Sequence, residues 1–332
     1  MGVARTEAEP ADLVAGARAG KVRAIARLIS MVENNSPRLR EVMRLLAPYT
    51  GHAHVIGLTG SPGVGKSTTA TALIAAYRAR GVRVGVLAVD PSSPFTGGAV
   101  LGDRVRMQHH ALDEHVYIRS MASRGHLGGL STAAPQALRV FDAAGFDVVL
   151  VETVGVGQSE VEIASTADTT LVLLAPGMGD GIQVAKAGIL EIADVFVVNK
   201  ADRDGVQNLV REIRGMIGLV RRVEGDWTPS VVRTVASAES GIGDLVEQID
   251  AHRDAQCLSG RWEQRRLVRS RAELEALALA EVRRRFLTGD RRAMVDLAAG
   301  MRDGEIDPYS AADQLLATLS AASLRHEGPG VR

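Results

Sequence analysis

The sequence predicts an α/β protein built on a mostly parallel sheet that helices cover on both faces, with helical N-terminal and C-terminal extensions. Two observations predict this class. Short apolar runs alternate with helical patterns between residues 54 and 256, and both ends of the chain carry helical periodicity alone. Unbroken apolar runs are typical of parallel strands buried on both faces. In such sheets, ligands bind at the carboxyl ends of the strands.

Composition and charge limit the classes of protein that the chain can be. Of the 332 residues, 46% are hydrophobic and 23% are charged, which is ordinary globular composition and excludes a collagen or a disordered chain. Lys and Arg (39) balance Asp and Glu (39), so we expect no nucleic-acid partner and no membrane-surface partner. No run reaches the roughly 18 apolar residues of a membrane span. A single cysteine excludes a disulfide framework and fits a reducing cytoplasm, so we expect a cytoplasmic protein.

Three domains are expected along the chain: a helical extension over 1–50, a nucleotide-binding domain over 51–256 and a helical arm over 257–332. In the first, Asn34–Pro37 breaks the helical pattern and begins a second helix. In the last, one long helix is expected over Arg261–Leu287, and Asp307-Pro308 is the start of another.

The middle domain alternates strands and helices. The expected strands are Val55–Thr59, Val82–Val89, Val116–Arg119, Phe146–Val151, Thr170–Ala175, Val195–Asn199 and Ser230–Val235. The expected helices are Lys66–Ala79, Thr132–Ala143, Ile182–Ile192, Val206–Ile217 and Ile242–Ala251.

A glycine-rich loop joins the first of these strands to the first of these helices, and it matches the Walker A pattern in full. Glycines let backbone N–H groups surround a phosphate, Lys66 supplies positive charge to the β- and γ-phosphates, and the Ser67 hydroxyl is a ligand for Mg²⁺. A tight turn without a ligand would need neither side chain. The pattern predicts a P-loop NTPase whose nucleotide contacts are Gly60, Ser61, Pro62, Gly63, Val64, Gly65, Lys66, Ser67 and Thr68.

A second motif predicts which base is bound. Asn199-Lys200-Ala201-Asp202 follows the apolar run 195–198 and matches the Asn-Lys-x-Asp guanine pattern. The Asp202 carboxylate can accept hydrogen bonds from the ring N–H and the exocyclic amine of guanine. Adenine has no such pair of donors and would leave the carboxylate unpaired. We therefore expect GTP and GDP as ligands rather than ATP.

Two acidic residues end apolar strands near the phosphate loop. Asp90 follows the second long strand and Glu152 ends the run 146–151. Together with Ser67 they form the predicted magnesium site, because carboxylates at this edge can hold the ion directly or through its waters. Gly155 could donate its N–H to the γ-phosphate with no side chain in the way.

Three glycine-rich stretches follow strands at this edge: Phe95–Gly102, Ser123–Ser131 and Gly177–Gly181. Each stretch is either a segment that changes conformation when the nucleotide is hydrolysed or a solvated linker, and the sequence leaves both interpretations open. The last precedes Lys186, one of only four lysines in an arginine-rich chain. We interpret Lys186 as a switch residue.

Longer strings resemble a known family, the MeaB/ArgK/MMAA-type GTPases, over about residues 10–325. The strings that carry the resemblance are Asp90–Gly98, Leu101–Arg104, Arg119–Gly125 and Glu152–Glu160.

The resemblance implies roles for further residues. Asp90, Asp103 and Glu152 match acids around Mg²⁺ and the nucleophilic water, and with Lys66 they form the expected catalytic set. Arg106 matches a switch arginine.

The resemblance also concerns larger segments. The 177–188 segment with Lys186 matches a switch that signals nucleotide state, and the helical ends match dimerisation elements, which implies a homodimer. One departure is that Val235-Ala236, followed by Ser237, stands where the family usually has Ser-Ala in a loop that contacts guanine.

The function implied by the family is a GTPase that gates adenosylcobalamin delivery to methylmalonyl-CoA mutase, or to a related acyl-CoA mutase, and protects that enzyme. Two alternatives remain. A nickel metallochaperone GTPase would need Cys/His clusters, which the sequence lacks. A binding scaffold with structural GTP would not need Lys66, Ser67, Asp90 and Glu152 together.

Overall fold

The computed structural model describes residues 9–91, 112–123, 133–153, 163–177, 190–220, 223, 225–288 and 291–326. The chain divides into two compact units, Met1–Ser270 and Arg271–Arg332, and each is described by itself. The boundary between them falls within the long helix α12 (Arg261–Thr288). The domain limits after residues 50 and 256 remain predictions.

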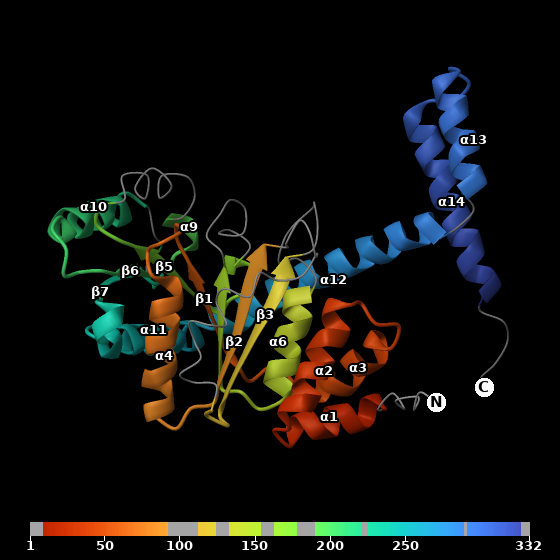
Figure 1. Ribbon diagram of the computed structural model, residues 1–332. Coiled ribbons are helices and arrows are strands. Elements are labelled where there is room, and N and C mark those ends of the chain that lie inside the picture. The colour runs from red at the N-terminus through yellow and green to blue at the C-terminus, as the bar shows by residue number, and fades with distance from the viewer. Residues whose placement is uncertain are drawn as a thin grey trace. The chain divides into compact units, whose positions relative to one another are not determined.

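The first unit is built on a parallel sheet, as predicted. Seven strands are seen in the described residues, in the order β3-β2-β4-β1-β5-β6-β7, and every neighbouring pair is parallel (Figure 1). β5 and β6 are buried along their whole length, which is why their sequences are almost entirely apolar after the two threonines that begin β5. The strands are β1 (His54–Thr59), β2 (Val84–Pro91), β3 (Val116–Ser123), β4 (Val148–Thr153), β5 (Thr169–Leu174), β6 (Val195–Val198) and β7 (Ser230–Arg233).

Helices cover both faces of this sheet (Figure 1). On one face, α4 (Lys66–Ala79) and α11 (Ile242–Leu258) share an apolar core with the strands. On the other, α10 (Val206–Leu219) packs on β5 and β6, while α6 (Ala133–Ala143) and the N-terminal helices pack on β2, β3 and β4. The N-terminal helices are α1 (Pro10–Arg18), α2 (Val22–Glu33), α3 (Leu39–Leu46) and the short η1 (Ala47–Tyr49). The predicted break at 34–37 lies between α2 and α3.

The boundaries of several elements differ from the predictions. β3 continues to Ser123 instead of ending at Arg119, because it pairs residue by residue with β2 along its whole length, from Val116 opposite Val84 to Ser123 opposite Pro91. α11 continues to Leu258, seven residues past the predicted end at Ala251. Of the helix predicted over 182–192, only α9 (Leu190–Ile192) falls within the described residues.

The second unit contains the rest of α12, α13 (Arg291–Arg302) and α14 (Pro308–His326). α14 begins as its sequence predicts: Asp307 Oδ1 accepts the N–H groups of Tyr309 at 2.9 Å and Ser310 at 3.0 Å, which satisfies two free donors of the first turn. Among the helices described, none is both long enough and apolar enough to cross a membrane.

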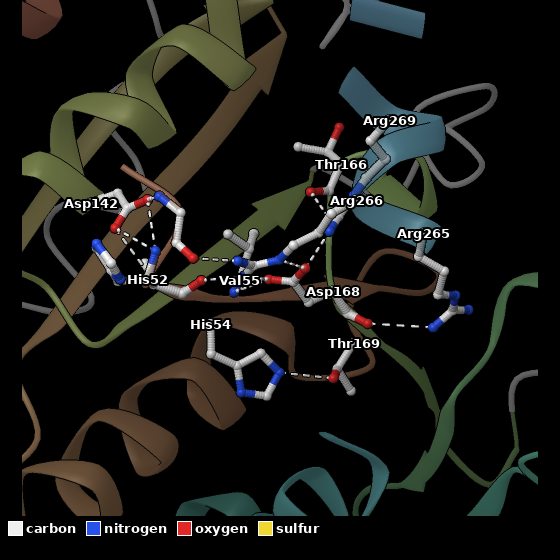
Figure 2. A network of polar contacts seen from close by, with 12 residues as sticks. His52, His54, Val55, Asp142, Thr166, Asp168, Thr169, Arg265, Arg266 and Arg269 are labelled. Carbon is white, nitrogen blue, oxygen red and sulfur yellow. Dashed lines mark hydrogen bonds and ion pairs between the residues drawn. The ribbon is translucent and has the colours of Figure 1, made fainter. Parts of the chain in front are cut away.

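A buried ion-pair cluster joins the first turns of α12 to the amino ends of the strands (Figure 2). Asp168, directly before β5, is 3% exposed. Its carboxylate accepts hydrogen bonds from the Val55 N–H at 2.9 Å and from Arg266 at 3.0 and 3.1 Å, and it also pairs with Arg269. Arg266 further donates to the carbonyl oxygen of Ala53 at 2.8 Å. One carboxylate therefore ties two strands and a helix together.

The charge of Asp168 depends on its arginine partners. Burial opposes ionisation and is the largest single effect, but the hydrogen bonds and charges of Arg266 and Arg269 together outweigh it and leave the pKa of Asp168 below its usual value. The carboxylate is therefore ionised in the native protein at neutral pH.

Candidate functional site

The loop between β1 and α4 contains glycines in backbone conformations that other residues rarely adopt. The φ angles are +139° at Gly60, +82° at Gly63 and +99° at Gly65. A Cβ atom on Gly60 would lie 2.3 Å from the carbonyl oxygen of Leu173, and one on Gly65 would lie 2.3 Å from Asn199 Nδ2. The loop therefore requires glycine at positions 60 and 65 for two reasons, conformation and space.

Gly65→Ala is expected to weaken nucleotide binding and to destabilise the protein by about 1–3 kcal/mol, because the new side chain must adopt a strained φ and displace Asn199. Thermal unfolding and a fluorescence titration with GDP measure the two effects. Gly215→Ala is the matched control, since Gly215 lies in α10 and an added Cβ meets no atom within 4 Å. A Gly65→Ala protein with wild-type GDP affinity would contradict this reading of the loop.

Lys66, the first residue of α4, has its ammonium group inside the loop. Its Nζ donates to the carbonyl oxygens of Gly60 at 2.7 Å and Ser61 at 3.2 Å, and the residue is buried. These acceptors are neutral. A phosphate oxygen carries negative charge and forms a stronger, charge-assisted hydrogen bond with an ammonium group. The loop thus holds the cation within reach of a phosphate.

Ser67 and Glu152, two of the three predicted magnesium ligands, are in contact. The Ser67 hydroxyl lies 2.6 Å from Glu152 Oε1, and both residues are buried. A hydroxyl and a carboxylate supply hard oxygen donors, which are the ligands that Mg²⁺ prefers. The donor set therefore fits this ion.

Asn199 connects three loops at the carboxyl ends of β1, β6 and β7. Its Nδ2 donates to the Val64 carbonyl at 2.8 Å, and its Oδ1 accepts from Thr234 Oγ1 and the Ala236 N–H, both at 3.1 Å. Asn199 is only 3% exposed. The phosphate loop, the Asn-Lys-x-Asp loop and the loop after β7 are therefore one bonded assembly.

The residues after Asn199 extend this assembly toward the surface. Lys200 has a φ of +56°, and its Nζ donates to the Gly63 carbonyl at 2.6 Å. The Ala201 N–H donates to the carbonyl oxygen of Thr234 at 3.0 Å. Asp202 is exposed, which leaves its carboxylate accessible to a ligand from solvent.

Thr234 was missed by sequence reasoning. A threonine at the end of a short strand has no local signal, because its role depends on Asn199, which lies 35 residues earlier.

The loop after β7 is ordered by backbone contacts. The Val235 N–H donates to the Ser240 carbonyl at 3.0 Å, and the Ala236 N–H donates to Asn199. Since neither contact uses the side chain of residue 235, valine in place of the family's usual serine is compatible with this geometry. The N–H groups of Val235 and Ala236 already donate to Ser240 and Asn199. Either N–H group could therefore donate to guanine only after it gives up its present acceptor. Ser237 lies in the short helix η4 (Ala236–Ala238) that follows.

The remaining predicted residues are only partly described. Ser61, Pro62, Val64 and Thr68 lie in the phosphate loop and the first turn of α4, where the pattern places them. Asp90 is the penultimate residue of β2, but its side chain lies outside the described residues, as do the whole of Asp103, Arg106, Gly155 and Lys186.

A sequence profile described as Methylmalonyl Co-A mutase-associated GTPase MeaB matches residues 25–291. The chain belongs to the MeaB family. A Pyrococcus abyssi protein named as a GTPase is 44% identical over 316 residues, which cover 94% of this chain and 98% of that protein. The mouse methylmalonic aciduria type A homolog, a mitochondrial protein, is 32% identical over 326 residues, 92% of this chain and 78% of its own.

The MeaB-family fold also matches a solved structure. The crystal structure of LAO/AO transport system kinase aligns with a TM-score of 0.69 at 29% identity, covering 96% of this chain and 100% of that chain. The chain is therefore a P-loop GTPase of the MeaB family, as the sequence predicts, and its fold implies a guanine-nucleotide ligand.

Proposed function

We propose that this GTPase hydrolyses Mg²⁺-bound GTP as a timer, and that its nucleotide state gates adenosylcobalamin delivery to a methylmalonyl-CoA mutase or a related acyl-CoA mutase and protects that enzyme. The observation that carries the proposal is the convergence of Lys66, the Ser67–Glu152 pair and Asn199 on one edge of the sheet. The family that the chain belongs to is described by its association with that mutase.

The chemistry assigned to the site consists of positioning and charge stabilisation. Lys66 leaves the carbonyls of Gly60 and Ser61 and bonds to the β- and γ-phosphates, which neutralises charge that develops as the γ-phosphoryl group is transferred to water. The amides of the phosphate loop, and that of Gly155, orient the phosphates.

Mg²⁺ would be held by Ser67, Glu152 and Asp90, with Asp103 beside the attacking water. When bound, the ion stabilises negative charge on the phosphate oxygens. The Ser67–Glu152 hydrogen bond sets these two oxygen donors 2.6 Å apart before any ion arrives. Arg106 and Lys186 are proposed to transmit the nucleotide state to the partner.

Asp202→Asn is expected to erode the preference for GTP over ATP by about tenfold or more, because an amide nitrogen replaces one of the two oxygens that accept guanine N–H groups. The new amide N–H suits a carbonyl oxygen, so affinity for xanthosine triphosphate is expected to rise. Competition titrations with GTP, ATP and xanthosine triphosphate measure all three affinities.

Asp204→Asn is the control, since this exposed acid lies two residues beyond the motif. An unchanged ratio in Asp202→Asn would show that the base is read elsewhere.

We also propose a cytoplasmic homodimer formed through the C-terminal helices. The second unit exposes large apolar side chains, among them Leu274 (69%), Leu279 (63%) and Val295 (64%). Exposed apolar side chains gathered on a few helices are typical of a surface that another protein covers.

The test of the proposed function is GTP turnover with and without a purified adenosylcobalamin-dependent methylmalonyl-CoA mutase. The proposal predicts that the mutase raises turnover and changes nucleotide affinity, and that a non-hydrolysable GTP analogue increases retention of the mutase on the immobilised chain. If neither turnover nor affinity responds, the scaffold alternative is favoured instead. Metal analysis of protein purified without an affinity tag tests the nickel alternative.

A further inference from the structure

We propose that Asp194 is a positioning residue for the loops that read guanine, an inference that rests on the proposed base site. Asp194 directly precedes β6 and Asn199 directly follows it, and β6 has only four residues. At a rise of about 3.3 Å per residue, the two side chains lie about 16 Å apart at opposite ends of one buried strand. Asp194 is thus remote from the nucleotide but rigidly connected to the base-binding loop.

The carboxylate of Asp194 holds several elements at once. Its Oδ2 accepts the Thr170 N–H of β5 at 2.9 Å, and its Oδ1 lies 3.0 Å from Arg265 Nη2 of α12 and 3.2 Å from His252 Nε2 of α11. The main-chain carbonyl of Asp194 accepts the Trp227 indole N–H at 2.7 Å. Asp194 is 6% exposed, so these bonds form in a largely water-free environment.

Asp194 contacts α11 and the segment before β7, and it lies directly before β6. The other ends of these elements adjoin the loops that are proposed to bind guanine. β6 ends in Asn199. Trp227 precedes β7, and the loop after β7 contains Thr234 and the Ala236 amide, which both bond to Asn199 Oδ1. α11 begins directly after that loop. Since closely packed strands and helices move as stiff units, the position of their near ends at Asp194 fixes the geometry of the two loops at their far ends.

A carboxylate only accepts hydrogen bonds, so we assign the ring proton of His252 to Nε2, which lies 3.2 Å from Asp194 Oδ1. In this tautomer Nδ1 accepts from Thr169 Oγ1 at 2.8 Å, and Thr169 Oγ1 accepts from His54 Nε2 at 2.8 Å. Burial lowers the pKa of His54 to about 3, so that ring is neutral at physiological pH. Burial also opposes the charge of Asp194, but the contacts with His252 and Arg265 outweigh it and lower its pKa.

Asp194→Asn therefore changes the hydrogen bonds of this side chain without changing its size. It keeps the shape of the side chain and its acceptor for Thr170, but it sets an NH2 group against the donors of His252 and Arg265. No cavity is created. The near ends of β6 and α11 are expected to separate slightly, which would disturb the alignment of Asn199 and Asp202 with the base.

The experiment compares affinities of the full chain for GDP, inosine diphosphate and ADP. Inosine lacks the exocyclic amine that Asp202 is proposed to read, while ADP tests the phosphate contacts alone. For Asp194→Asn, we expect the ratio of GDP to inosine diphosphate affinity to fall about five- to tenfold while ADP affinity stays within about twofold. Asp250→Asn is the control, because Asp250 lies on α11 in a half-exposed pair with Arg80.

A ratio that stays at the wild-type value while the melting temperature falls would overturn the proposal, since Asp194 would then be structural only. Arg265→Gln provides a second variant in case Asp194→Asn fails to fold: Arg265 is about half exposed, and its loss removes one partner of Asp194. An unchanged ratio in Arg265→Gln would count equally against the proposal. A wild-type protein without any preference for GDP would instead overturn the base assignment, and this inference with it.

Discussion

Lys66→Ala is expected to weaken GTP binding about 100-fold or more, because each hydrogen bond from a charged group to a phosphate contributes about 1.5–3 kcal/mol. In the structure the ammonium group bonds to two carbonyls of the phosphate loop, so it lies inside the loop that is proposed to bind the phosphates. Calorimetric titration with a non-hydrolysable GTP analogue measures the loss.

Lys21→Ala is the matched control for this prediction. Lys21 is another of the chain's four lysines, and it is exposed at the start of α2, on an element that does not contribute to the phosphate loop. Its loss should leave affinity unchanged. If Lys66→Ala binds the analogue as tightly as wild type and unfolds at the same temperature, the phosphate-loop assignment is wrong.

Asp168→Ala is expected to destabilise the first unit by about 3 kcal/mol, because it removes a buried carboxylate and leaves the partly buried charges of Arg266 and Arg269 without it. The Val55 N–H also loses its acceptor. Urea unfolding measures the change. Asp250→Ala, which breaks a half-exposed ion pair with Arg80, should cost about 1 kcal/mol or less. Equal effects of the two substitutions would contradict the role assigned to the buried cluster.

The same carboxylate gives a pH dependence of known sign. Because the pKa of Asp168 is lowered in the native protein, its contribution to stability is present above the ordinary aspartate value of about 3.9 and is lost as pH falls through the native value. The free-energy difference between wild type and Asp168→Asn should therefore be largest near neutral pH and should shrink below about pH 4. A difference that grew on acidification would contradict this sign.

The sequence predicts most of the nucleotide-binding edge because its signals are local. The glycines, Lys66 and Ser67 are consecutive, and the helix expected over Lys66–Ala79 is observed with those bounds. Asn199 is recognised from a four-residue pattern. In each case the chemistry depends on neighbours in the chain, which a pattern can capture.

The opposite edge of the sheet could not be predicted in this way. Asp168 and Asp194 stand as single acids before apolar runs, and their arginine partners lie 71–101 residues later in α12. Nothing in the periodicity of that helix distinguishes Arg265, Arg266 and Arg269 from its other arginines. The end of β3 was missed for a related reason, because strand pairing with β2 decides it.

The most direct test of the central claim is isothermal titration calorimetry of the full chain with Mg²⁺ and a non-hydrolysable GTP analogue, repeated with the matching ATP analogue. The structure predicts saturable binding of one guanine nucleotide per chain, much weaker binding of the adenine nucleotide, and weaker guanine-nucleotide binding in Gly65→Ala. Absence of any heat of binding for the guanine nucleotide, or equal affinity for both analogues, would contradict the proposed site.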